Sequence, residues 1–154
     1  MVVPGPPSTH GYPELAFRAP EGWQERTVLS FALPRDAGPA TTVMVRRIEC
    51  FDITAHAARE LMKQAKASPS FELLDARPRT VAGRNAVEHV VAWAANEGRV
   101  EQRIVHVEGE AATAYVLVCT CAETDAPWVA ASFDELLATF RIQGGVFDAR
   151  EAVR

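Results

Sequence analysis

The stretch that decides the fold is AVEHVVAWAANEGRVEQRIVHVEGEAATAYVLVCTCA, residues 86–122. It is rich in the β-branched and aromatic residues that favour strands. We expect three strands in it, at about residues 86–95, 99–108 and 112–122. Asn96-Glu97-Gly98 and Gly109-Glu110 separate these strands, and connections this short join antiparallel neighbours. The stretch therefore predicts three consecutive strands of an antiparallel sheet.

The chain before this stretch predicts further strands. Ala82-Gly83-Arg84-Asn85 has the composition of a hairpin turn, so the residues before it should pair with residues 86–95. A turn rich in proline and glycine lies between two earlier candidate strands, which we expect to form another hairpin. These additional strands are expected at about residues 14–19, 26–33, 41–48 and 71–81. The sheet should therefore have about six or seven strands.

Residues 26–33 alternate between large and small side chains, the period of a strand with two unequal faces. The large side chains are those of Leu29, Phe31 and Leu33, and the small ones are those of Val28, Ser30 and Ala32. We assign the large side chains to the core. The small side chains would permit close approach of another molecule.

Two helices complete the predicted fold. The first should run from a cap at Thr54 to about Ala67 and end at Ser68-Pro69. Its predicted apolar stripe is Ala58, Leu61, Met62 and Ala65. The second should begin at a cap at Asp125, with Pro127 in its first turn. Its predicted stripe, which should dock on the sheet, is Val129, Phe133, Leu136, Leu137 and Phe140.

Length and composition indicate one α/β (α+β) domain. The 154 residues suit a single core, with a Pro-rich arm at residues 1–13 and a charged tail at residues 143–154. The net charge of −4, without a basic cluster, argues against nucleic acid as a partner. We see no secretory signal and no apolar run of membrane-spanning length, so we expect a cytoplasmic protein that does not insert into membranes.

The reactive side chains of the sequence are not arranged in any pattern that predicts an enzyme. The chain lacks a Gly-x-Ser-x-Gly sequence, and Cys119 and Cys121 do not form a Cys-x-x-Cys pair. Cys50 makes the cysteine count odd, and we expect all three thiols to be reduced and structural. We therefore expect no cofactor.

The histidines suggest little chemistry either. His56 and Glu60 have the spacing of an ordinary solvated pair on a helix. His89 and His106 lie on predicted neighbouring strands and could face each other, but two histidines without a third ligand make a weak metal case. We expect no metal site. An enzyme that uses one of these histidines stays a minor alternative.

Gln102 is the most informative polar residue. It shares a strand face with Val100, Ile104 and His106, so an amide lies within a partly apolar surface. A solvent-facing side chain is the simpler interpretation. The functional interpretation is a binding face on which the amide donates and accepts hydrogen bonds.

The order of these elements resembles the DcrB-related family over about residues 14–142. The motifs that carry the resemblance are Phe17 before Pro20-Glu21-Gly22-Trp23-Gln24-Glu25-Arg26, then Val81-Ala82-Gly83-Arg84, Gln102-Arg103 and the helix from Phe133 to Phe140. The resemblance implies a PsbP-like sandwich, in which helices cover a curved and mostly antiparallel sheet.

Cytoplasmic members of this family include effector-associated chaperones of bacterial type VI secretion, which look like homodimers that shield transmembrane-like segments of an effector. The resemblance thus implies an adaptor without catalytic activity. By family similarity Gln102, Val28 and Ser30 match positions that line the groove. We predict a partner-binding face formed by Val28, Ser30, Ala32, Gln102 and Ile104. The alternative is a small-molecule or lipid-binding domain with an apolar cavity.

Overall fold

The computed structural model describes residues 21, 28–33 and 39–142. The arm, the predicted strand at residues 14–19, the turn after it except Glu21, and the tail lie outside the described residues. For Val28 only the backbone is described.

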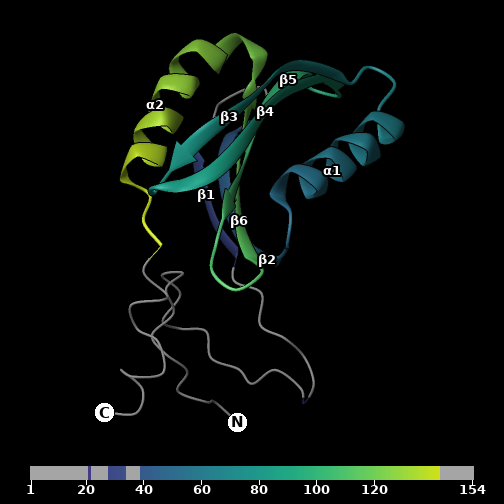
Figure 1. Ribbon diagram of the computed structural model, residues 1–154. Coiled ribbons are helices and arrows are strands. Elements are labelled where there is room, and N and C mark those ends of the chain that lie inside the picture. Colours follow the sequence, from purple (N-terminus) through teal and green to yellow (C-terminus); the bar gives the residue numbers. More distant parts are fainter. Residues whose placement is uncertain (1–20, 22–27, 34–38, 143–154) are drawn as a thin grey trace.

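Within the described residues, six strands form one sheet in the order β1-β2-β6-β5-β4-β3, and every neighbouring pair is antiparallel (Figure 1). The strands are β1 (Val28–Leu33), β2 (Thr41–Glu49), β3 (Glu72–Val81), β4 (Arg84–Ala95), β5 (Gly98–Glu108) and β6 (Thr113–Ala122). The three strands predicted from residues 86–122 are β4, β5 and β6, and they lie side by side. The prediction of an antiparallel meander is confirmed.

The turn between β3 and β4 explains why this connection can be so short. Ala82 and Gly83 both have positive φ, at 54° and 72°. Two successive residues of this kind form the turn whose twist matches that of the flanking strands. The glycine adopts this conformation without strain, whereas Ala82 is held in it by the hairpin.

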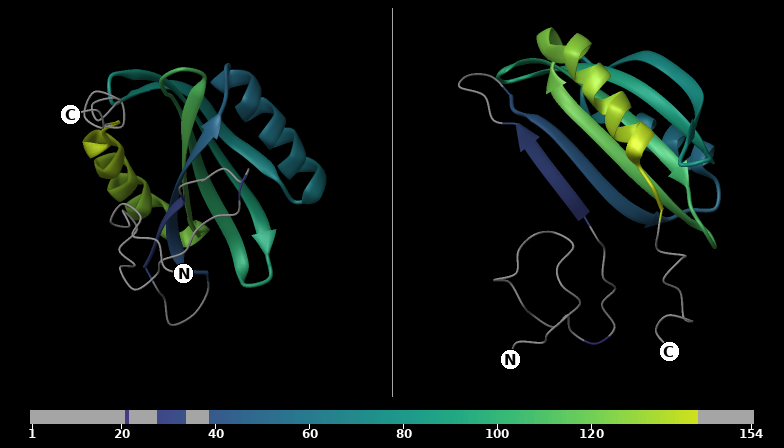
Figure 2. Two further views of the ribbon diagram at one scale, coloured as in Figure 1. Left: turned by 90° about the horizontal axis from the view of Figure 1, so that it is seen from below. Right: turned by 90° about the vertical axis from the view of Figure 1, so that its left-hand side faces the viewer.

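Two helices cover opposite faces of the sheet (Figure 2). The helix α1 (Ile53–Ala67) lies over β4 and β5, and α2 (Ala126–Thr139) lies over β6 on the other face. A short 3-10 helix, η1 (Glu123–Asp125), connects β6 to α2. The chain is therefore α+β with one helix on each side of a curved antiparallel sheet.

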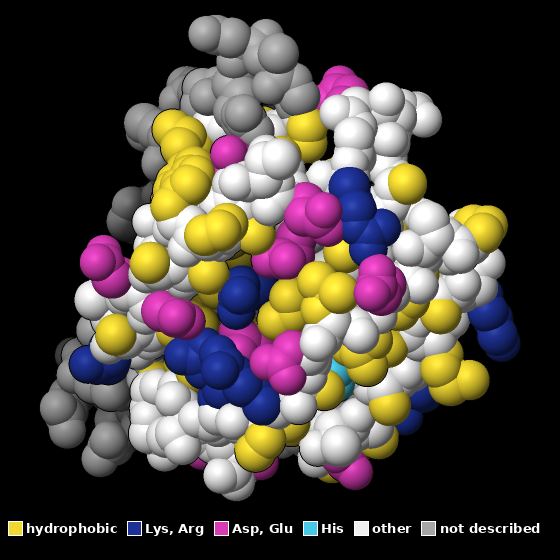
Figure 3. Space-filling view, turned by 90° about the horizontal axis from the view of Figure 1, so that it is seen from above, with side chains coloured by type: hydrophobic (Ala, Val, Ile, Leu, Met, Phe, Trp, Pro, Cys, Tyr) yellow, Lys and Arg dark blue, Asp and Glu magenta, His cyan; other side chains and the backbone are white. Residues whose placement is uncertain are grey.

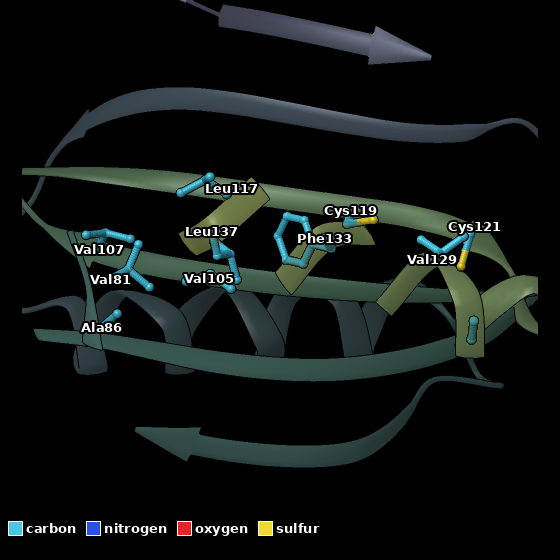
Figure 4. Packing of buried hydrophobic residues seen from close by; sticks show 11 residues of the cluster. Val81, Ala86, Val105, Val107, Leu117, Cys119, Cys121, Val129, Phe133 and Leu137 are labelled. Carbon is cyan, nitrogen blue, oxygen red and sulfur yellow. The ribbon is translucent and has the colours of Figure 1, made fainter. Parts of the chain in front are cut away.

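The larger core lies between α2 and the sheet. Figure 4 shows Phe133 and Leu137 of α2 among strand side chains, including Val105 and Leu117. Val129 is buried as well, and Leu136 and Phe140 pack at the margin of the cluster. The predicted stripe of the second helix is therefore correct. Its predicted N-cap residue, Asp125, is also correct, although the Asp125 side chain makes no capping hydrogen bond.

The smaller core lies under α1, and here the predicted stripe is correct only at Leu61. The side chains of α1 that are buried are Ile53 and Ala57, whereas Ala58, Met62 and Ala65 are exposed. The cap is Asp52 rather than Thr54, since its carboxylate accepts a hydrogen bond from the Ala55 backbone N–H. The stripe that faces the sheet is Ile53, Ala57, Leu61 and Gln64. Because this stripe ends with the polar residue Gln64, the sequence does not show it as an apolar face.

The predicted core role of the large β1 side chains is wrong among the described residues. Phe31 is 59% exposed and Leu33 is 52% exposed, and Leu29 is only partly buried. These side chains share the α2 face of the sheet, but β1 is at its edge, with β2 between it and β6. Because α2 packs on β6, it leaves the β1 side chains uncovered.

Candidate functional site

The register of the strands brings most of the predicted binding residues onto one face. Across β1, β2, β6 and β5, one row runs from Ser30 through Met44 and Val118 to Ile104. The next row runs from Ala32 through Thr42 and Thr120 to Gln102. Directly paired residues of antiparallel strands point to the same side, and this is the side that α1 covers farther along the sheet.

The part of this surface beyond α1 is accessible, and we call it the open face. Its residues are Ser30, Ala32, Thr42, Met44, Val118 and Thr120. Ser30, Ala32 and Met44 are exposed, and the other three are half-buried. Small and flexible side chains in this arrangement allow another chain to approach closely. Val28 begins β1 opposite Arg46, so its backbone lies beside the same surface.

Gln102 lies at the boundary between the open face and α1. Its Oε1 accepts a hydrogen bond from Gln64 Nε2 at 3.1 Å, and its Nε2 donates to Thr120 Oγ1 at 3.0 Å. The Gln102 amide thus links α1 to Thr120 of the open face. Gln64 Oε1 is buried without a hydrogen-bond partner, which leaves an acceptor at this boundary unused.

Ile104 behaves differently from the other predicted binding residues. It is 8% exposed and packs with Val91, Val116 and the helix residue Leu61. A partner can contact Ile104 only if α1 moves away from the sheet.

Five residues of this region were not predicted from the sequence: Thr42, Met44, Val118 and Thr120 on the open face, and Gln64 at its boundary. The period of two places Thr42 with Met44, and Val118 with Thr120, on one face of each strand, but only the register of the sheet joins these faces to Ser30 and Gln102. Gln64 could have been found from its place in the stripe at positions i, i+4, i+8 and i+11 that begins at Ile53.

Three histidines lie at the contact between α1 and the sheet, one on the helix and two on strands. His56 Nδ1 and His106 Nε2 are 3.1 Å apart, so the predicted surface histidine in fact joins the helix to β5. His89 of β4 pairs in register with Ile104, so it lies on the same face of the sheet as His106. The Nδ1 atoms of His89 and His106 are buried without a hydrogen-bond partner.

The electrostatic surroundings keep this group neutral at pH 7. Burial lowers the pKa of His106 to about 4, together with the charge that His56 and His89 carry when protonated and the charge of Arg46. Burial also lowers the pKa of His56, although Glu60 Oε1 lies 3.8 Å from its Nε2 and opposes the shift. Burial likewise lowers the pKa of His89.

A second polar cluster lies on the α2 face. Glu88 is fully buried, and its carboxylate accepts hydrogen bonds from Arg77 Nε at 2.7 Å and from Arg79 Nη1 at 3.2 Å. Arg79 also donates to Asp134 on α2, and Arg103 Nη1 lies 3.7 Å from Glu88. Mutual pairing of this kind is typical of structural support. Figure 3 shows acidic and basic side chains interspersed in the same way at one end of the molecule.

Two of the three cysteines are buried, as the sequence predicts, and the third is not. Cys119 and Cys121 are buried in the larger core, and Cys50 is partly buried. Burial raises the pKa of Cys119 to about 12, so this thiol carries no charge at neutral pH.

A hollow of about 440 Å³ lies at the start of α1. Its lining includes Phe51 and Val87 but also Asp52, Arg79 and Glu108. A lipid or other apolar ligand requires a mainly apolar cavity with few polar groups. This hollow, with its mixed lining, is therefore not the apolar cavity that the small-molecule alternative requires.

Residues 21, 28–33 and 39–142 contain neither a candidate metal-binding cluster nor a candidate membrane-spanning helix. Within them, no group of three His, Cys, Asp or Glu side chains is arranged to hold a metal ion. Neither described helix combines the length and apolarity that crossing a bilayer requires.

The open sheet with one helix on each face and an exposed surface of small residues defines an α+β sandwich of the PsbP-like kind. The family model described as DcrB matches residues 14–139. The chain belongs to the DcrB family, as the resemblance predicted.

Solved structures show the same fold. PA94, a protein of unknown function from Pseudomonas aeruginosa, is 20% identical with a TM-score of 0.68, over 84% of this chain and 92% of that one. CyanoP, the PsbP of Synechocystis sp. PCC 6803, is 11% identical with a TM-score of 0.53, over 84% of this chain and 99% of that one. Among curated proteins, none matches the chain.

Proposed function

We propose that this chain is a non-catalytic adaptor or chaperone that binds a hydrophobic, transmembrane-like segment of a type VI secretion effector. The observation that carries the proposal is the open face, which is continuous in register from Ser30 and Ala32 to Gln102. Membership of the DcrB family supports an accessory role without catalysis. The role requires the chain to act in the cytoplasm, before export.

The surface suits an apolar helix as its guest. Small side chains on β1 let a helix backbone come close, and Met44, which is 41% exposed, adapts its shape to the guest. Thr120 and Gln102 supply polar groups at the boundary with α1 for the few polar atoms of such a segment. The histidines and buried thiols are not needed for this function.

Co-expression with the effector's apolar segment at neutral pH tests the proposal. We expect the segment to be soluble with this chain and to aggregate without it, because exposed apolar helices associate in water. Equal solubility in both cases would refute the proposal. Native mass spectrometry of the purified protein would reveal a retained lipid or metabolite and so support the cavity alternative.

Substitutions on the open face sharpen the test. Ser30→Trp should block capture by filling the surface, and Gln102→Ala should weaken it by removing the amide. Ser132→Trp is the matched control, since Ser132 is also exposed but lies on α2, on the other face. All three variants should remain folded by circular dichroism. If Ser132→Trp impairs capture as much as Ser30→Trp, the open face is not the binding site.

We also propose that the working unit is a homodimer, as the family resemblance implies. Sedimentation equilibrium of the full chain, with and without the guest segment, tests this. A monomer under both conditions would contradict it.

A further inference from the structure

Two polar contacts attach α1 to β5. One joins His56 to His106, and the other joins Gln64 to Gln102. The step of eight positions from His56 to Gln64 spans about 12 Å of helix, and the step of four positions from Gln102 to His106 spans about 13 Å of strand. The matched lengths mean that α1 lies along β5. The order of the contacts shows that the two elements run in opposite directions, with one contact near each end of α1.

The surface between these contacts is mostly apolar, although His89 of β4 is paired in register with Ile104. Ile104 lies midway between His106 and Gln102 on β5 and packs with Val91 of β4 and Val116 of β6. We call these three residues the floor. Leu61 of α1 packs against the floor and is only half-buried, whereas Ile53 and Ala57 are the α1 side chains that are buried.

The histidine contact depends on protonation. A hydrogen bond between two imidazoles needs one ring nitrogen without a proton, and two imidazolium rings present only donors and repel. His106 Nδ1 is buried without a partner, so a second N–H on that ring would also be unsatisfied.

The neighbouring elements add mostly positive charge. On α1, Arg59 and Lys63 oppose protonation of His56 and Glu60 favours it. Arg46 of β2 opposes protonation of both His56 and His106, and His89 of β4 opposes that of His106. β6 contributes an uncharged residue, Val116, opposite His106.

We propose that the contact between His56 and His106 is a proton-sensitive latch, whose opening in acid releases α1 from β5 and uncovers the floor. Release would extend the open face, because Ile104 continues the row formed by Ser30, Met44 and Val118. The effect on a guest rests on the proposed function, whereas the movement of α1 does not.

The direction of the pH effect follows from the shifted pKa values. In the closed state the pKa of His106 is about 4, against 6.5 for a free imidazole. The released state therefore binds protons more readily between pH 6.5 and pH 4. Attachment of α1 should weaken as the pH falls through this window and should be strongest above it.

Hydrogen exchange of the full chain without any guest tests the latch. After correction for intrinsic rates, protection of the α1 amides relative to the α2 amides should fall on the order of tenfold between pH 7 and pH 5. His106→Gln should abolish most of this change, because glutamine can hydrogen-bond to His56 but does not titrate. If His106→Gln does not fold, His56→Gln on the partly exposed helix serves the same purpose.

The matched control is His89→Gln, since the contact that reaches α1 comes from His106 and not from His89. This variant should keep most of the pH response. The latch is refuted if wild-type α1 keeps its relative protection at pH 5, or if His106→Gln and His56→Gln respond like the wild type. Because no guest is present in the exchange experiment, a failure of capture at neutral pH does not affect its result. Likewise, a negative exchange result does not affect the capture test.

Discussion

The two helices cover the same sheet by different means. α2 inserts Val129, Phe133 and Leu137 into the larger core, and each is at most 3% exposed. α1 buries Ile53 and Ala57 and is attached to β5 through a histidine pair and a glutamine pair. Apolar burial is insensitive to pH, whereas the histidine contact is not. The comparison indicates that α2 stabilises the fold and that α1 is the element that can move.

The first way to test this comparison is Phe133→Ala. Removing a fully buried aromatic ring should lower the free energy of unfolding by about 3–5 kcal/mol, through lost transfer energy and the cavity left behind. Trp128→Ala, on the same helix but at a 48% exposed position, should cost well under half as much. Denaturation in urea measures both, and similar losses would contradict the assignment of the main core to α2.

The pH dependence of stability tests the contribution of the histidine contact between α1 and β5. His106 has a pKa of about 4 in the folded chain and about 6.5 in the unfolded chain, so the unfolded state binds more protons between these values. Stability should fall by on the order of 3 kcal/mol as the pH drops from above 6.5 to below 4. His106→Leu should flatten this dependence. An unchanged slope in urea midpoints would show that His106 is not the group responsible.

Glu88→Gln tests the polar cluster on the α2 face. The change removes the charge that pairs with three arginines, and we expect a loss of about 1–3 kcal/mol in the free energy of unfolding. The arginines are partly exposed and can be hydrated, which limits the loss. Asp134→Asn is the control, since its exposed pair with Arg79 should contribute about 0–1 kcal/mol. Equal effects would mean that burial of Glu88 is unimportant.

The smallest expected effect is that of Gln64→Ala. It removes one side-chain hydrogen bond between α1 and Gln102, a contribution of about 1 kcal/mol. Amide exchange should quicken at the C-terminal end of α1 and leave α2 unchanged. Lys66→Ala, at an exposed position on the same helix, is the control. Identical exchange in the two variants would show that the glutamine pair does not hold the helix.

Much of this architecture could be predicted because it depends on local periodicity. The alternation of residues in β5 is sufficient to place Gln102 and Ile104 on one face of the strand. The helical repeat from Val129 identifies the side of α2 that packs on the sheet. For α1 the same method failed, because Gln64 lies on the buried side and exposed Met62 resembles a core residue.

The sequence by itself determined which segments are strands or helices and which side chains share a strand face, since backbone geometry fixes these periods of two and 3.6 residues. Only the tertiary structure decided that Phe31 is left exposed at a sheet edge, that Ile104 is covered, and that His56 meets His106 fifty positions along the chain. Those outcomes depend on strand order and on where each helix docks, and no local period specifies a contact between residues so far apart.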